Sequence, residues 1–403
     1  MYSVSTGKCN VLILTGSYGE GHNQVSNAVK DKILREQPDW TVQICDFFDY
    51  VDPVFNHLIH FGYHQVIKHF SYGYKWFYEA TQELDPNSRF QRILNRMGQQ
   101  KLLETIELFS PDAIVCTFPT PAGVVSQLKA KGKIDIPLIT IITDVAVHSQ
   151  WIHPYVDFYL VAANTVARQL HHRGIPQEKI LVTGIPLRRQ FEEPLVGSDF
   201  LDKNRLDPGL FTLMIMGGGI GFFQGIEEII LQLDRLVYPI QLLVITGTNK
   251  VLARKLLHIS ESCRNRICVF GHVDNIAEIM EHSDLLLTKA GGVTIFEALA
   301  KKLPMILFHP LPGHEMSNVR YLTSNKAAIL AENEEAVIQN ISMLRKEPQL
   351  LERMKKVMEQ MSRPTAAGDA ARVIIEAARA YRSQNPGRSK AESGYRELLA
   401  ENS

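Results

Sequence analysis

Two adjacent glycines and a carboxylate in the second half of the chain have the types and spacing of a phosphate and ribose site. Gly291 and Gly292 directly follow the apolar run 285–288 and precede a pattern with helical spacing. N–H groups at the start of a helix can bind a phosphate at the positive end of the helix dipole. Glu297 follows one turn later, where a carboxylate can reach ribose hydroxyls. The alternative is an ordinary βαβ unit with a tight glycine turn.

Further polar residues flank this motif. Thr294 is expected to cap the helix, and Pro304 ends it. Glu315 and Asn318 follow the next apolar run, residues 305–308. Ligands of open α/β sheets bind at the carboxyl ends of the strands. We therefore expect these two side chains to lie beside the glycine motif.

A second candidate centre lies near the start of the chain. Gly16, Gly19 and Gly21 form a glycine-rich turn between the apolar run 11–14 and a helix that begins near His22. The spacing resembles the dinucleotide motif GxGxxG without matching it. At a helix N-terminus the dipole disfavours the imidazolium ion, so a neutral His22 is suited to accept a proton. The alternative is a capping or packing histidine.

Asp144 is the second candidate for the base. It directly follows the predicted strand 138–142, and a carboxylate at that position points to the ligand edge of a parallel sheet. It can activate a hydroxyl or cap the following loop, and the sequence leaves both open. His148, His171 and His172 have no carboxylate at ligand spacing, so we expect no metal site.

These residues must be positioned by the alternation of strands and helices that runs through both halves of the chain. That alternation predicts an α/β protein with two doubly wound parallel sheets, and 403 residues are enough for two domains. The boundary is expected in a polar stretch with Pro194, Gly197 and Pro208. The predicted parts are residues 1–190, a linker 191–208, residues 209–365, a crossing helix 366–384 and a tail 385–403.

Composition limits the partners. The chain has 43 basic and 43 acidic residues, so no overall field attracts it to nucleic acid. Its five scattered cysteines indicate a reducing cytosol. We expect no signal peptide and no membrane span, which makes any membrane contact a local patch. Residues 46–97 mix aromatic and basic side chains and are the candidate patch; a helix packed on the domain is the alternative.

The motifs together resemble a known family. GG-x-T-x-x-E-A, then P-G-x-E-x-x-N, the run TDVAVHSQWIHPYVDFYLVA and the segment GIPLRRQF are similar to the GT-B glycosyltransferases that make glycolipids. These are the bacterial processive diacylglycerol glucosyltransferases and the plant monogalactosyldiacylglycerol synthases. The resemblance extends to about residue 345. It implies a GT-B fold, in which two Rossmann-like domains face a cleft and a C-terminal helix crosses back to the first domain.

The resemblance also implies roles for individual residues. On the donor side, Glu297 would hold the ribose, Glu315 and Asn318 the hexose, and glycines the diphosphate. The segment after strand 267–270 would read the uracil. The expected donor set is Gly217, Gly218, Gly219, Phe270, Val273, Gly291, Gly292, Thr294, Glu297, Glu315 and Asn318, and the expected acceptor set is Gly21, His148, Trp151 and Arg188, with His22 or Asp144 as the base.

The predicted function is an inverting transfer of a hexose from a UDP-sugar to a lipid such as diacylglycerol, at the inner face of the cell membrane. No cofactor or divalent metal is expected, because helix dipoles and backbone donors can stabilise the leaving UDP. His314 stands where the related sequences have glutamine. The sequence therefore leaves open whether the transferred hexose is glucose or galactose. The alternatives are a lipid II-type N-acetylglucosaminyltransferase, a UDP-N-acetylglucosamine 2-epimerase and a non-catalytic binding protein. The sequence does not indicate an oligomeric state.

Overall fold

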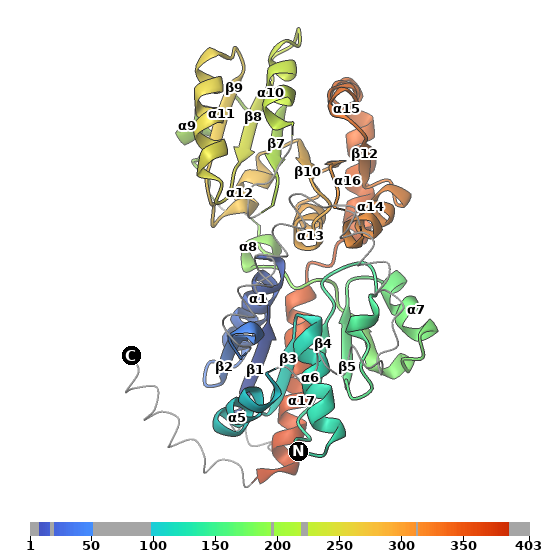
Figure 1. Ribbon diagram of the computed structural model, residues 1–403. Coiled ribbons are helices and arrows are strands. Elements are labelled where there is room, and N and C mark those ends of the chain that lie inside the picture. Colours follow the sequence, from blue (N-terminus) through green and yellow to red (C-terminus); the bar gives the residue numbers. More distant parts are fainter. Residues whose placement is uncertain are drawn as a thin grey trace. The chain divides into compact units, whose positions relative to one another are not determined.

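The chain forms two compact units in the computed structural model (Figure 1), which describes residues 8–16, 20–50, 98–194, 197–218, 225–311 and 313–386. Unit 1 comprises Met1–Arg188 together with Thr365–Ser403, and unit 2 comprises Arg189–Pro364. Each unit contains one six-stranded, wholly parallel sheet. The predicted fold class is confirmed, including the return of the last helix to the first unit.

The strands of the sheet of unit 1 are short, and its central strands are apolar and buried on both faces, as parallel strands between helix layers should be. Its strand order is β2-β1-β3-β4-β5-β6. The strands are β1 (Asn10–Thr15), β2 (Thr41–Asp46), β3 (Ala113–Cys116), β4 (Leu138–Ile141), β5 (Phe158–Val161) and β6 (Ile180–Val182).

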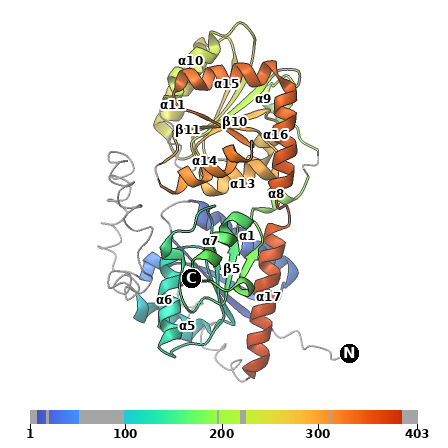
Figure 2. The ribbon, with the colours of Figure 1, turned by 90° about the vertical axis from the view of Figure 1, so that its right-hand side faces the viewer.

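Helices cover both faces of this sheet. Right-handed crossovers place α1 on one face and α5, α6 and α7 on the other, because the chain reverses direction across the sheet after β2. The last helix, α17, packs on α1 and β3 through a stripe of buried alanines that allows close approach (Figure 2). The helices are α1 (Glu20–Glu36), α5 (Gln99–Phe109), α6 (Pro119–Ala130), α7 (Asn164–His172) and α17 (Ala366–Gln384), with 3-10 turns η1 (Phe47–Tyr50), η2 (Ser149–Trp151) and η3 (Gln177–Lys179).

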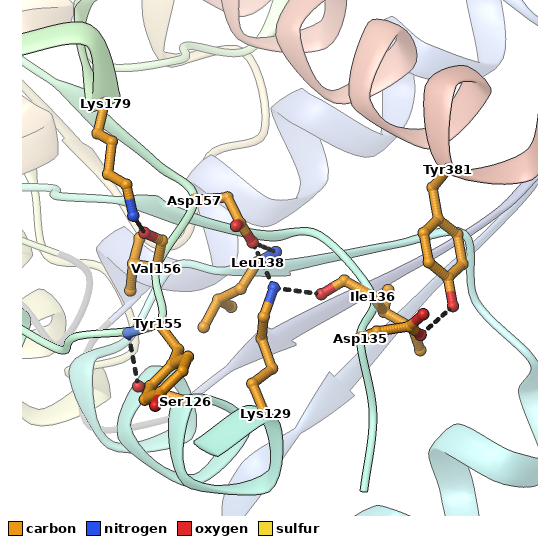
Figure 3. A network of polar contacts seen from close by, with 10 residues as sticks. All are labelled: Ser126, Lys129, Asp135, Ile136, Leu138, Tyr155, Val156, Asp157, Lys179 and Tyr381. Atoms are coloured by element: carbon orange, nitrogen blue, oxygen red, sulfur yellow. Dashed lines mark hydrogen bonds and ion pairs between the residues drawn. The ribbon is translucent and has the colours of Figure 1, made fainter. Parts of the chain in front are cut away.

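A polar network fixes the amino ends of the central strands of unit 1 (Figure 3). The Nζ of Lys129 on α6 donates to Asp157 Oδ2 at 2.5 Å and to the Ile136 carbonyl at 2.8 Å. The same Asp157 oxygen accepts the Leu138 N–H at 2.7 Å. On α17, the Tyr381 hydroxyl donates to Asp135 at 2.6 Å. The network thus joins α6, α17 and the segments that enter β4 and β5.

Unit 2 repeats this design with the strand order β12-β11-β10-β7-β8-β9. Its core is built from the buried residues of the strands and of the helices packed on them. The strands are β7 (Thr212–Met216), β8 (Gln241–Ile245), β9 (Arg266–Phe270), β10 (Leu285–Thr288), β11 (Met305–Phe308) and β12 (Ala328–Ala331).

The helices of unit 2 also divide between two faces. Right-handed crossovers place α10 and α11 on one face and α12, α13 and α14 on the other, and α15 packs on α10 (Figure 2). The helices are α8 (Arg189–Glu192), α9 (Phe200–Asn204), α10 (Ile226–Asp234), α11 (Lys250–Ser262), α12 (Ile276–Glu281), α13 (Gly292–Ala300), α14 (His314–Ser324), α15 (Glu334–Lys346) and α16 (Pro348–Met361). None of the described helices of the protein is long and apolar enough to traverse a bilayer.

Several local predictions were wrong. Thr294 does not cap α13: the N-cap is Gly291, and Thr294 is the third helical residue. The sequence analysis gave no helix to the P-G-x-E-x-x-N motif, but α14 begins at His314. Glu315 and Asn318 therefore lie on its first turns. The sequence reading missed β12 and α16. The aromatic residues 51–97 and the tail from residue 387 lie outside the described residues.

We predict that Lys129→Met lowers the free energy of unfolding by about 1–3 kcal/mol, since it leaves two buried or half-buried acceptors without their charged donor. Denaturant unfolding measures this loss. Lys131→Met, at an exposed lysine of the same helix end, is the control and should change the value by less than about 0.5 kcal/mol. Equal values for the two variants would contradict the structural role of the network.

Candidate functional site

In unit 1, His22 lies where three strand ends meet. It sits half-buried in the first turn of α1, which follows β1, and its Nδ1 is 2.7 Å from the Thr117 carbonyl, which follows β3. The Thr143 hydroxyl, after β4, is 3.3 Å from the same nitrogen. A carbonyl oxygen only accepts, so Nδ1 carries the hydrogen and a neutral ring has its lone pair on Nε2. The fold therefore fixes a tautomer suited to accept a proton.

The orientation of the His22 ring is also set by packing. Phe118 contacts it edge-on with ring centroids 5.0 Å apart. A Cβ at Gly16 would come within 2.9 Å of Phe118 and of Phe48, so a side chain at residue 16 would displace both rings. A glycine is thus required at position 16, because the two phenyl rings approach the backbone closely there. Ser26 supports the same loop, with its hydroxyl 2.9 Å from the Thr117 hydroxyl.

The other predicted residues of unit 1 lie on the same sheet edge. Asp144 is half-buried and directly follows Thr143, whose hydroxyl contacts the His22 ring. His148 is buried and caps η2, where its Nδ1 accepts the Gln150 N–H at 3.2 Å. Trp151 is buried, and its turn packs on α6. The structure thus brings His22 and Asp144 to the same end of the sheet, while Trp151 is part of the packing against α6.

Two further residues of the predicted acceptor set, Gly21 and Arg188, lie in unit 1. Gly21 lies inside the first turn of α1, not in the turn before it. Arg188 is half-buried and is the last residue of unit 1 before α8. The sequence reading did not consider His153, which is buried; burial lowers its pKa to about 4 and keeps its ring neutral. Its place below η2 and its exposed fraction of 3% mark it as a packing residue.

In unit 2, the loop that carries the adjacent glycines is held on both sides. Strands β7 and β10 pair up to Met216–Thr288, and the Thr288 hydroxyl donates to the Met216 carbonyl at 2.7 Å. The fully buried Asn318 donates its amide N–H to the Ala290 carbonyl at 2.8 Å. These two bonds fix residues 289–291 between the sheet and α14.

This loop leaves the N-terminal end of α13 open. Gly291 is the N-cap and supplies no side-chain cap, and the first turn contains no acidic residue. A Cβ at Gly291 would meet no described atom within 4 Å, so the position opens to space. Gly292 begins the helix, and Gly217 and Gly218 directly follow the neighbouring strand β7, with Gly218 at φ +81°. Gly219 lies outside the described residues.

The polar residues predicted to hold the sugar are buried around this loop. Glu297 is 4% exposed and lies one turn into α13. Glu315 is equally buried, and its Oε2 accepts the Leu311 N–H at 2.6 Å. Glu315 and Asn318 therefore hold the two loops in place through backbone contacts. Their direct contacts with a ribose or hexose stay predictions.

Phe270 and Val273 lie at the end of β9 and in the loop after it. The Phe270 ring stacks on Phe200 of α9, with centroids 6.1 Å apart, and Phe200 stacks on His282 at 5.2 Å. Thr246 donates to the Phe270 carbonyl through its N–H and its hydroxyl. Val273 is half-buried. A short helix from the predicted linker thus positions the residue predicted to lie beside the base.

Comparison with known proteins assigns the chain to a family. A monogalactosyldiacylglycerol synthase profile matches residues 22–187, and a glycosyltransferase family 28 C-terminal domain profile matches residues 212–369. The chain is 33% identical over 352 residues to a processive diacylglycerol beta-glucosyltransferase of Staphylococcus carnosus, covering 87% of this chain and 88% of that protein. The chain belongs to this family. The enzyme of the same name from Bacillus mycoides is 32% identical over 368 residues, covering 91% and 93%.

Solved structures agree on the fold. MurG of Acinetobacter baumannii aligns with a TM-score of 0.61 at 16% identity, over 92% of this chain and all of that one. A UDP-glucosyltransferase from Polygonum tinctorium aligns at 0.60 and 13%, over 93% and 99%. A UDP-GlcNAc 2-epimerase from Neisseria meningitidis, solved with UDP-GlcNAc, aligns at 0.56 and 16%, over 91% and 99%. At these identities the likeness establishes the GT-B fold alone.

The sequence analysis did not single out three residues that lie beside the predicted site residues. Thr117 and Thr143 contact the His22 ring, and Lys289 lies between the two glycine motifs of unit 2. Each follows a predicted strand by one or two residues, which is the signal that could have identified them. Within the described residues no group of three histidines, cysteines or carboxylates could hold a metal ion.

We predict that Glu315→Ala lowers the free energy of unfolding by about 1–3 kcal/mol, because the Leu311 N–H loses its buried acceptor. Glu315→Gln keeps an acceptor and should lose less. Thermal and denaturant unfolding measure both, with Glu332→Ala at an exposed position as the control. A Glu315→Ala variant as stable as the control would show that Glu315 does not hold the loop.

Proposed function

We propose that the protein is an inverting glycosyltransferase that moves glucose from UDP-glucose to diacylglycerol and forms a β-glucosyl lipid. The observation that carries this proposal is the identity of 33% to a processive diacylglycerol beta-glucosyltransferase across 87% of the chain. Both halves of the chain contribute, since one family profile matches each. An epimerase or a lipid II-type transferase is supported only by fold similarity at 16% identity.

The proposed reaction is a single displacement. The acceptor hydroxyl oxygen bonds to the anomeric carbon while the bond from that carbon to the β-phosphate oxygen breaks, and the electron pair leaves with UDP. His22 takes the hydroxyl proton at Nε2, which the Nδ1 contact with Thr117 supports. The neighbouring Asp144 is the alternative base or orients the acceptor. Attack opposite the leaving group converts an α-linked donor into a β-glycoside.

The donor would bind on unit 2. Gly217, Gly218, Gly291 and Gly292 supply backbone N–H groups without side chains in the way, at the open end of α13. These donors and the helix dipole would stabilise the leaving diphosphate without a divalent ion. The buried Glu297 is the proposed ribose contact.

The proposed acceptor is a membrane lipid, so we further propose that the protein works at the inner face of the cell membrane. The enzyme would meet its acceptor as a peripheral protein. The mixed aromatic and basic composition of residues 46–97 supports this proposal, because such side chains suit the lipid headgroup region.

The proposed function is tested by mixing the purified full chain with UDP-glucose and vesicles that contain diacylglycerol, with a chelator in place of added metal. We expect UDP release together with a β-glucosyl lipid, identified by mass spectrometry and by the anomeric coupling in NMR. Turnover only with UDP-galactose or UDP-N-acetylglucosamine would reject glucose as the donor. Sugar epimerisation without lipid product would reject the transferase.

We predict that His22→Asn lowers kcat by about 100- to 10,000-fold, the usual effect of removing a general base. Initial rates of UDP release with saturating donor measure the loss, and circular dichroism checks the fold. His172→Asn, at an exposed histidine that ends α7, should leave the rate unchanged. A His22→Asn variant with full activity would move the role of base to Asp144.

A further inference from the structure

Lys289 is a cationic residue directly next to the glycine loop of the proposed diphosphate site. It follows β10 directly and precedes the glycine loop that starts α13. Its side chain reaches back to the neighbouring loop: a Cβ at Gly218 would lie 3.9 Å from Lys289 Cε. Lys289 therefore lies between the glycines that follow β7 and the glycines at the start of α13.

The position of Lys289 is fixed by the residues on either side of it. Thr288, one residue before, bonds to the Met216 carbonyl, and Ala290, one residue after, accepts the Asn318 amide. Both bonds are buried. The backbone that carries the lysine is thus held from two sides, and the ammonium group explores only the space that its own stem allows. Because its backbone is held, the lysine carries its positive charge in a limited space before a ligand binds.

Lys289 has no ion-pair partner among the described residues, although the buried carboxylates of Glu297 and Glu315 lie in the same part of unit 2. The side chain is half-buried, and among the residues that the structure describes it makes no ion pair and no hydrogen bond. Bringing an ammonium group partly out of water without a partner costs free energy. The adjacent turn of α13 adds positive potential, since it has no acidic residue. The ammonium group and the free N–H groups at the start of α13 thus place two sources of positive charge at the glycine loops.

We propose that Lys289 contacts the diphosphate of the donor and stabilises the negative charge that develops on it as the glycosidic bond breaks. This inference deepens the proposed function and rests on it. A uridine diphosphate carries its charge on the two phosphates, and the base and ribose carry none. Removing the lysine charge should therefore weaken binding of the diphosphate group and leave uridine binding unchanged.

The test is isothermal titration of the full chain with UDP, UMP and uridine, without lipid. Lys289→Met keeps the length of the stem and removes the charge; we expect its Kd for UDP to rise about 10- to 100-fold, with no change for uridine. Lys289→Arg keeps the charge and should stay within about 5-fold of the wild type. The control is Lys250→Met, at an exposed lysine that begins α11.

An unchanged UDP affinity in Lys289→Met would overturn the inference, as would an equal loss for UDP and uridine or a Lys289→Arg variant as weak as Lys289→Met. These results leave the proposed function intact, because the wild type still binds UDP. A wild type that binds no UDP overturns both the inference and the proposed donor. Since the titration contains no lipid, an error in the proposed acceptor does not affect it.

Discussion

In unit 2, β7 and β10 run parallel and pair from Leu213–Leu285 to Met216–Thr288, so the two segments leave the sheet at the same edge. Parallel pairing brings Gly217 and Gly291, which are 74 positions apart in the chain, into neighbouring loops. The proposed diphosphate site depends on this pairing, because it takes its glycines from both loops.

The same constraint operates in unit 1 with different chemistry. β1, β3 and β4 end side by side, and a carbonyl after β3 accepts the Nδ1 hydrogen of a histidine after β1. A backbone carbonyl is a reliable tautomer-setting partner, since it cannot become a donor. The close approach of Phe118 and Phe48 to Gly16 then fixes the ring from the other side. Packing and hydrogen bonding thus act together on one imidazole.

The two units divide the proposed reaction between them. Unit 1 holds the candidate base, and unit 2 holds the candidate anion site with its buried carboxylates. Membership of the processive diacylglycerol beta-glucosyltransferase family agrees with this division, because each of the two matching profiles covers one half. In the proposed reaction, unit 2 must stabilise the negative charge of the leaving group, and backbone N–H groups together with Lys289 are the proposed source of that stabilisation.

The sequence by itself determined the fold class and most of the strands. Buried parallel strands must be continuous apolar runs, and β10 and β11 were predicted at their observed bounds for that reason. The motifs also identified the family and the strand ends on which site residues lie. β12 and α16 were missed because a strand with two alanines and only two large apolar side chains has a weak apolar signal, and a helix of mixed composition has a weak periodic one.

Only the tertiary structure decided what each polar side chain contacts. Glu315 and Asn318 look like ligand contacts in the sequence, yet they bond to Leu311 and Ala290. The tautomer of His22 depends on Thr117, 95 residues away, and the position of Lys289 on Thr288 and Asn318. Hydrogen-bond partners distant in sequence are set by the register of strands and the packing of helices, which no local pattern encodes.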